Sequence, residues 1–152
     1  MSDKPVIQCR RIRPESDADI AAPEYMTAHS AGMDLCAAVN EPVAVGPGEI
    51  RLIPTGFAVC LPADHEAQIR PRSGLAVKHG IGLINSPGTI DADYRGEIQV
   101  ALINHGQSVF MVNRGDRIAQ MVISPVSRVR VALVDRLPDS ARSSGGFGHT
   151  GI

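Results

Sequence analysis

Two aspartates and a tyrosine lie between glycines in residues 88–96, which read Gly-Thr-Ile-Asp-Ala-Asp-Tyr-Arg-Gly. The flanking glycines allow a tight turn and let a ligand approach main-chain N–H and C=O groups that a Cβ would shield. Asp91 and Asp93 would share one face of an extended strand but diverge in a tight turn. Because Asp and Gly are also ordinary turn residues, the segment alone leaves a ligand site and a solvated hairpin turn equally open.

An anion site is indicated at the start of residues 73–78, Ser-Gly-Leu-Ala-Val-Lys, which could form one or two turns of helix with Ser73 as N-cap. Free N–H groups and the positive end of the helix dipole would then point towards whatever Arg72 faces. A plain capped helix is the alternative, and the preceding arginine favours the anion site. Arginine supplies 13 of the 15 cationic residues, and its planar fork suits phosphate or carboxylate, although a codon bias would have the same effect.

The composition changes in residues 139–152, which are rich in glycine and serine and cannot form a core by themselves. Residues 143–146 could wrap backbone donors around phosphate oxygens while Arg142 adds charge and Phe147 stacks on a ring. A disordered tail is the alternative. We favour an arm that orders over a ligand, because a pure linker has no need of one of the three phenylalanines in the chain.

Length and charge exclude several classes of protein. A chain of 152 residues is long enough for one domain with its own core. Lys+Arg of 15 against Asp+Glu of 16, without a block of like charges, disfavours a general binder of nucleic acid or membrane surfaces. Cys9, Cys36 and Cys60 show no metal-site spacing and indicate reduced structural thiols. The polar N-terminus and the lack of a membrane-spanning stretch predict a soluble, cytoplasmic protein.

Proline and glycine recur every few residues, which leaves no room for long helices. The intervals hold short runs rich in valine and isoleucine, at the spacing of an all-β sandwich or barrel. In residues 97–104 both alternating faces are mostly apolar, so we expect this strand to be covered on both sides. The expected strands are residues 6–12, 43–45, 50–53, 57–61, 67–70, 81–84, 97–104, 109–112, 117–123 and 129–134.

Five islands follow one another along the chain: Ser-Ala-Gly-Met-Asp-Leu (30–35), Pro-Arg-Ser-Gly-Leu-Ala (71–76), residues 85–96, Arg-Gly-Asp-Arg-Ile-Ala-Gln (114–120) and residues 142–151. In this order and wording the chain resembles the trimeric dUTPase family. The resemblance implies an all-β, jelly-roll-like barrel with one short helix, assembled as a homotrimer that hydrolyses dUTP to dUMP and pyrophosphate with Mg2+. It also implies a barrel domain over residues 1–138 and an arm over residues 139–152 that closes the active site.

The resemblance assigns the catalytic and metal-binding groups. Asp91 matches the carboxylate that orients and deprotonates the water attacking the α-phosphorus, where positioning carries most of the rate. Asp34 matches an acidic residue that contacts Mg2+ through water, which suits a metal that keeps several waters and takes its other ligands from the triphosphate. A residue capping a turn is the alternative for Asp34. Asp93 receives no role, and His149, in the arm, is the only histidine expected near the ligand.

The resemblance also assigns the substrate contacts. Arg72, Ser73, Gly74 and Gln120 match phosphate-binding residues, whereas Arg114 and Arg117 could equally be structural ion-pair partners. Tyr94 matches the ring under the sugar, where a 2′-hydroxyl would clash, and ordinary core packing is its alternative. A β-hairpin from Asn85 to about Gln99 would read uracil through main-chain groups. The implied substrate-binding residues are therefore Arg72, Ser73, Gly74, Asn85, Thr89, Ile90, Tyr94, Gln99, Gln120, Arg142, Gly146 and Phe147.

Two other functions remain open from the residues. A deoxycytidine triphosphate deaminase of the same fold would need a general acid or base at C4 of the base, and Glu97 is the carboxylate just after the turn. The 88–94 segment suits the hydrolase better. A non-catalytic trimeric scaffold or nucleotide sensor is the third hypothesis, although the chain is about as long as the motifs require and carries no partner-specific insertion.

Overall fold

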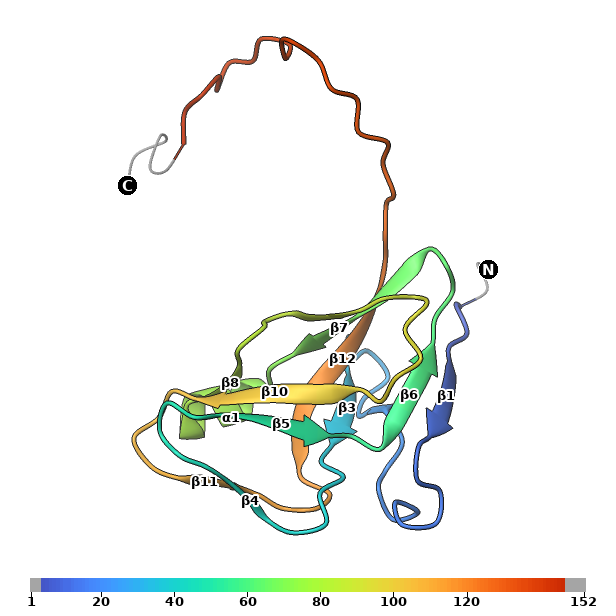
Figure 1. The fold of residues 1–152 in the computed structure, drawn as a ribbon, viewed down its shortest axis with the longest axis vertical. Helices are drawn as coiled ribbons and strands as arrows, with labels where there is room; N and C mark the ends of the chain where they lie inside the picture. Colours follow the sequence, from blue (N-terminus) through green and yellow to red (C-terminus); the bar gives the residue numbers. More distant parts are fainter. Residues whose placement is uncertain (1–3, 147–152) are drawn as a thin grey trace.

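Short antiparallel strands carry most of the regular structure of residues 4–146, the part of the chain that this computed structural model describes (Figure 1). Within that part, the predicted all-β class with one short helix is confirmed. The elements are β1 (Gln8–Arg11), β2 (Glu24–Tyr25), β3 (Met33–Cys36), β4 (Val43–Val45), β5 (Ile50–Pro54), β6 (Phe57–Cys60), β7 (His65–Arg70), α1 (Ser73–His79), β8 (Ile81–Leu83), β9 (Gly88–Ile90), β10 (Gln99–Asn104), β11 (Phe110–Val112) and β12 (Arg117–Pro125).

Two larger sheets contribute most of the core. One has the strand order β2-β3-β12-β7-β9 and the other β5-β10-β8, while β1 pairs with β6 and β11 with β4. Leu35, Ile69 and Met121 of the first sheet share one buried hydrophobic cluster with Val100 of the second. Because side chains alternate along a strand, burial of Met121 leaves its neighbour Gln120 on the opposite face of β12. The core therefore fixes which polar side chains of β12 face outward.

The strand expected to be covered on both sides, β10, is fully buried on one face of the single chain and only partly covered on the other, where Ile103 is buried and Ala101 is half-buried. Val100 and Leu102 are fully buried. The opposite face continues across β5, where Ile50 and Leu52 pair with Ile103 and Ala101 and are 49% and 61% exposed. We call this surface the outer apolar face; it consists of the exposed Ile50, Leu52 and Ile84 and the half-buried Ala101, while Ile103 on the same side is buried.

Residues 129–134 were expected to form a strand, and this expectation is wrong. Strand β12 ends at Pro125, and residues 126–146 leave the body as an extended segment (Figure 1). Val129, Val131 and Leu133 are 81%, 79% and 96% exposed. A strand needs a partner for its N–H and C=O groups, and no strand within residues 4–146 pairs with this segment. The boundary between residues 1–138 and the 139–152 arm stays a prediction.

Helix α1 starts one residue earlier than predicted. Arg72 has the extended conformation of an N-cap (φ −92, ψ 126), and its carbonyl already accepts a hydrogen bond from the Ala76 N–H. Ser73 is thus the first helical residue and not the cap. The helix ends at Gly80 in the left-handed region (φ 69), where a Cβ would lie 2.5 Å from the Gly106 nitrogen. In the described part of the chain, no helix is long and apolar enough to cross a membrane.

Candidate active site

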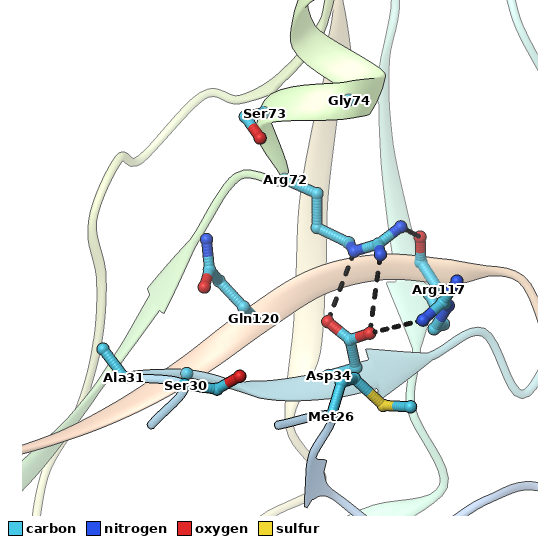
Figure 2. Close-up of a pocket in the computed structure, with 10 residues that line it drawn as sticks. Met26, Ser30, Ala31, Asp34, Arg72, Ser73, Gly74, Arg117 and Gln120 are labelled. Atoms are coloured by element: carbon cyan, nitrogen blue, oxygen red, sulfur yellow. Dashed lines mark hydrogen bonds and ion pairs between the residues drawn. The ribbon is translucent and has the colours of Figure 1, made fainter. Parts of the chain in front are cut away.

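A polar cavity of about 360 Å³ opens between β3, β12 and the start of α1 (Figure 2). Three of the five islands meet there: residues 30–35, 71–76 and 114–120. The islands are tens of residues apart in the sequence, and the pairing of the inner strands β3, β12 and β7 brings them together. The cavity is lined by Met26, Ser30, Ala31, Gly32, Asp34, Arg72, Ser73, Gly74, Arg117 and Gln120.

The Asp34 carboxylate holds two arginines at this cavity (Figure 2). Its Oδ1 lies 3.3 Å from Arg72 Nε, and its Oδ2 lies 3.1 Å from one terminal nitrogen of Arg117. Arg72 also donates to the Arg117 carbonyl at 3.2 Å. Two guanidiniums against one carboxylate leave a net positive charge with spare N–H donors, which suits a polyanion such as a phosphate chain.

A β-bulge in β12 aims both Arg117 and Gln120 at the cavity. Residues three apart in a regular strand point to opposite faces. The pairing with β3 shifts between Arg117 and Ala119, so that one extra residue is absorbed and Gln120 comes to lie opposite Asp34. Gln120 Nε2 then donates to the Pro71 carbonyl at 3.0 Å. A Cβ at position 32 would lie 2.5 Å from Gln120 Oε1, so glycine there lets the Gln120 side chain keep this position.

The first turn of α1 borders the same cavity. Ser73 and Gly74 line it, and their backbone N–H groups belong to the helix turn that has no intrahelical acceptor. A Cβ at Gly74 would meet no heavy atom of residues 4–146 within 4 Å, so the space beside the backbone is open. Arg72, Ser73, Gly74 and Gln120, the predicted phosphate contacts, are therefore brought together with Asp34.

The third island is not part of this cavity. Asn85, Thr89, Asp91 and Tyr94 are exposed, and within residues 4–146 none of them lines it. The predicted hairpin from Asn85 to Gln99 is also more complex. Strands β8 and β10 pair with each other, but the segment between them crosses to the other sheet, where β9 pairs with β7. Ile90 ends β9 and Gln99 begins β10, so the two residues belong to different sheets.

Tyr94 is held over its own turn. Its N–H donates to the Asp91 carbonyl at 3.1 Å, and its hydroxyl donates to the Glu97 carbonyl at 3.1 Å. The ring occupies the space that a side chain would need at Gly96. With 43% of Tyr94 exposed, the ring packs against its own backbone and still presents a surface to solvent, so core packing is not its role within the single chain.

The arm residues lie away from the cavity within the described chain. Arg142 donates to the Gly145 carbonyl at 2.9 Å, and Arg142 and Gly146 are exposed. Phe147 and His149 lie outside the described residues. Neither Arg142 nor Gly146 lines the cavity formed by the other islands.

The two arginines left undecided by the sequence have different partners. Arg117 contacts Asp34 at the cavity, whereas Arg114 binds Asp19 at 2.7 Å and the fully buried Asp17 at 3.1 Å. Hydrogen bonds to Asp19 and then Asp17 raise the pKa of Arg114, and the same contact with Arg114 lowers the pKa of Asp19. Arg114 is thus an ion-pair partner in this structure. The sequence left Arg117 undecided between a phosphate contact and an ion-pair partner, because the bulge that brings it to the cavity is not visible in the sequence.

The carboxylate that a deaminase would need, Glu97, already forms hydrogen bonds within the protein. Glu97 accepts from two guanidinium nitrogens of Arg13 at 2.8 and 3.1 Å and from the Gly56 N–H at 2.8 Å. Its side chain is 15% exposed. A carboxylate with both oxygens engaged in this way is poorly placed to exchange protons with a substrate.

Sequence comparison with known proteins points to one family. A sequence model of the dUTPase family matches residues 18–151. Deoxyuridine 5′-triphosphate nucleotidohydrolase of Maricaulis maris (strain MCS10) is 63% identical over 134 residues, which cover 87% of this chain and 88% of the relative. A mutant dUTPase of Staphylococcus bacteriophage 80alpha with dUpNHpp has a TM-score of 0.86 at 23% identity, over 97% of this chain and 99% of that one.

A second solved structure gives the same fold. A mutant dUTPase of phage phi11 of S. aureus, described as revealing the coordination of a structural Mg(II) ion, has a TM-score of 0.76 at 24% identity. The match covers 86% of this chain and 97% of that one. These likenesses confirm the predicted jelly-roll-like fold class. With the family match spanning most of its length, the chain belongs to the dUTPase family.

Proposed function

We propose that the chain hydrolyses dUTP to dUMP and pyrophosphate by attack of water on the α-phosphorus. Family membership supports the reaction. The observation that carries the proposal is the cavity in which one carboxylate holds two guanidiniums beside the first turn of α1. In a cell this reaction would keep uracil out of DNA and supply dUMP for thymidylate synthesis.

The triphosphate binds in this cavity. Arg72 and Gln120 donate side-chain hydrogen bonds to its oxygens, and Ser73 and Gly74 donate backbone N–H groups. Arg117 adds a second positive charge, held in place by Asp34 at 3.1 Å. Because these donors are fixed by the β3-β12 pairing and by α1, they need little reorganisation when charge develops on the leaving pyrophosphate.

Mg2+ fits the donor set as an ion carried by the nucleotide. Within residues 4–146, no group of three or more His, Cys, Asp or Glu side chains could hold a metal ion by itself. Asp34 would bind it through water, with phosphate oxygens as direct ligands, since Mg2+ keeps several waters and binds substrate phosphates. When bound, the ion neutralises charge on the phosphates. Asp34 retains room for a water because its two oxygens have four lone-pair sites and its guanidinium contacts use three.

Asp91 acts as the base that aligns and deprotonates the attacking water, and the surrounding segment reads the nucleoside. Main-chain groups near Asn85, Thr89, Ile90 and Gln99 recognise uracil. Tyr94 lies under the deoxyribose, where a 2′-hydroxyl would clash. The exposure of the tyrosine ring supports this role, because a ring buried in the core could not meet a ligand.

The active sites form between copies of the chain in a homotrimer. The cavity with Arg72 and the segment with Asp91 do not share a pocket in one chain. A second copy would bring its Asp91 to the cavity of the first. The arm of a third copy, with Arg142, Gly146 and Phe147, would close the site.

The outer apolar face is the surface on which we expect the copies to meet. Leu52, 61% exposed beside the half-exposed Ile50, is its most exposed residue. Leu52→Glu would bury a charge at that contact, and it should turn a trimer into monomers with at least about a hundredfold lower turnover. Sedimentation or light scattering measures the mass, with Val77→Glu on the exposed face of α1 as control. A Leu52→Glu chain that stays trimeric would place the contact elsewhere.

The substrate assignment is tested by release of pyrophosphate from dUTP, dCTP, dTTP and UTP with Mg2+. We expect turnover with dUTP and weak turnover with the other three. Release of ammonia from dCTP would instead identify a deaminase, and tight binding of dUTP without turnover would identify a sensor. The substrate is a free nucleotide, so we expect no nucleic-acid or membrane partner. The free thiols of Cys9, Cys36 and Cys60 suit the reducing cytoplasm.

A further inference from the structure

Glu97 ends the segment that carries Asp91 and Tyr94, and its side chain is fixed from a distant part of the chain. Arg13 grips it with both terminal guanidinium nitrogens, at 2.8 Å to Oε1 and 3.1 Å to Oε2. The Gly56 N–H donates to Oε1 at 2.8 Å. A two-point contact between a planar guanidinium and a carboxylate fixes orientation as well as distance.

Arg13 is itself anchored in the protein. Its Nε lies 2.8 Å from Oδ2 of Asp17, close enough for an ion pair although not directed as a hydrogen bond. Asp17 is fully buried, and its Oδ1 lies 3.1 Å from Arg114. Arg114 in turn binds Asp19 at 2.7 Å and the Val39 carbonyl at 3.0 Å. Because the buried Asp17 needs both arginines, Arg13 has little freedom to move away from Glu97.

The backbone of Glu97 positions the ring of Tyr94. The Glu97 carbonyl accepts the Tyr94 hydroxyl at 3.1 Å, and the Tyr94 N–H donates to the Asp91 carbonyl at 3.1 Å. Both ends of the turn are therefore joined to the tyrosine. A shift of the Glu97 backbone would move the Tyr94 ring and, through its N–H, the backbone of Asp91.

We infer that the ion pair between Glu97 and Arg13 positions Tyr94 and thereby sets the preference for deoxyribose over ribose. Glu97 and Arg13 act as positioning residues, since neither lines the cavity. The inference rests on the proposed function, which assigns the deoxyribose to Tyr94. A ring held rigidly excludes a 2′-hydroxyl, whereas a ring free to move by a fraction of an ångström accommodates it.

The test compares kcat/KM for dUTP with kcat/KM for UTP. Glu97→Ala removes every side-chain contact of this residue and should narrow the dUTP-to-UTP ratio about tenfold. Glu97→Gln keeps an acceptor for Gly56 and Arg13, so it should narrow the dUTP-to-UTP ratio by only about threefold. The matched control is Asp64→Asn, which removes another carboxylate that contacts a neighbouring side chain, His65, at 2.7 Å; its ratio should equal that of the wild type.

A merely structural ion pair would lower the melting temperature and the amount of active enzyme, and both substrates would lose activity equally. An unchanged ratio, within twofold, in both Glu97 variants would overturn the inference. If Glu97→Ala does not fold, Glu97→Gln decides the result, with a threefold narrowing expected. A wild-type chain that releases no pyrophosphate from dUTP would refute the proposed function, whereas normal wild-type turnover with an unchanged ratio refutes this inference alone.

Discussion

Asp91→Asn lowers kcat for dUTP by about 10²- to 10⁴-fold, because the amide cannot take the proton of the attacking water. The substitution conserves shape, and Asp91 is an exposed residue on a turn, so the fold and its melting temperature should not change. The KM for dUTP should also stay within a few-fold, since the proposed triphosphate contacts lie on Arg72, Ser73, Gly74 and Gln120.

Steady-state pyrophosphate release measures this effect, and Asp93→Asn is the matched control. Asp93 is an exposed carboxylate in the same turn, two residues further on, and it should keep turnover within about threefold of the wild type. Unaltered turnover of Asp91→Asn, or an equal loss in both variants, would remove Asp91 from its role as the base.

Deletion of residues 141–152 should leave a folded trimer with at least about a hundredfold lower turnover, because the site would stay open to water. The core does not depend on the arm: β12 ends at Pro125, and residues 126–144 are exposed. The melting temperature should therefore fall by less than about 2 °C, as expected when no buried contact is lost.

Size-exclusion chromatography, thermal melting and pyrophosphate release together test the deletion. A truncated chain that is both trimeric and fully active would show that the arm has no catalytic role. A truncated chain that no longer assembles would instead show that the arm, and not only the outer apolar face, holds the copies together.

Local patterns predicted the strands whose apolar residues find a partner within the chain. The alternation in residues 97–104 became β10, and the run at 117–123 became part of β12. The same alternation in Val129, Val131 and Leu133 failed, because a strand forms only where another strand supplies hydrogen bonds, and none within residues 4–146 does so. Sequence alone cannot state where that partner is.

The residues of the candidate site were likewise predicted only where the signal is local in the sequence. Arg72, Ser73 and Gly74 were indicated by an arginine before a helix start, which is a local signal. The approach of Asp34 to Arg117 depends on a β-bulge, and a one-residue shift in pairing leaves no mark in the sequence. The contact between Arg13 and Glu97 joins residues 84 positions apart, so no spacing rule could have found it.

The account rests on a site that takes Asp91 from one copy and Arg72 from another. Asp91→Asn and Arg72→Gln chains should each be inactive as pure trimers. When the two chains are unfolded together in equal amounts and reassembled, about three-quarters of the trimers contain both kinds of chain. In each mixed trimer one of the three sites is intact, so about a quarter of the wild-type turnover should return. If both residues came from the same chain, every site would carry one lesion, and the mixture would stay as inactive as its components.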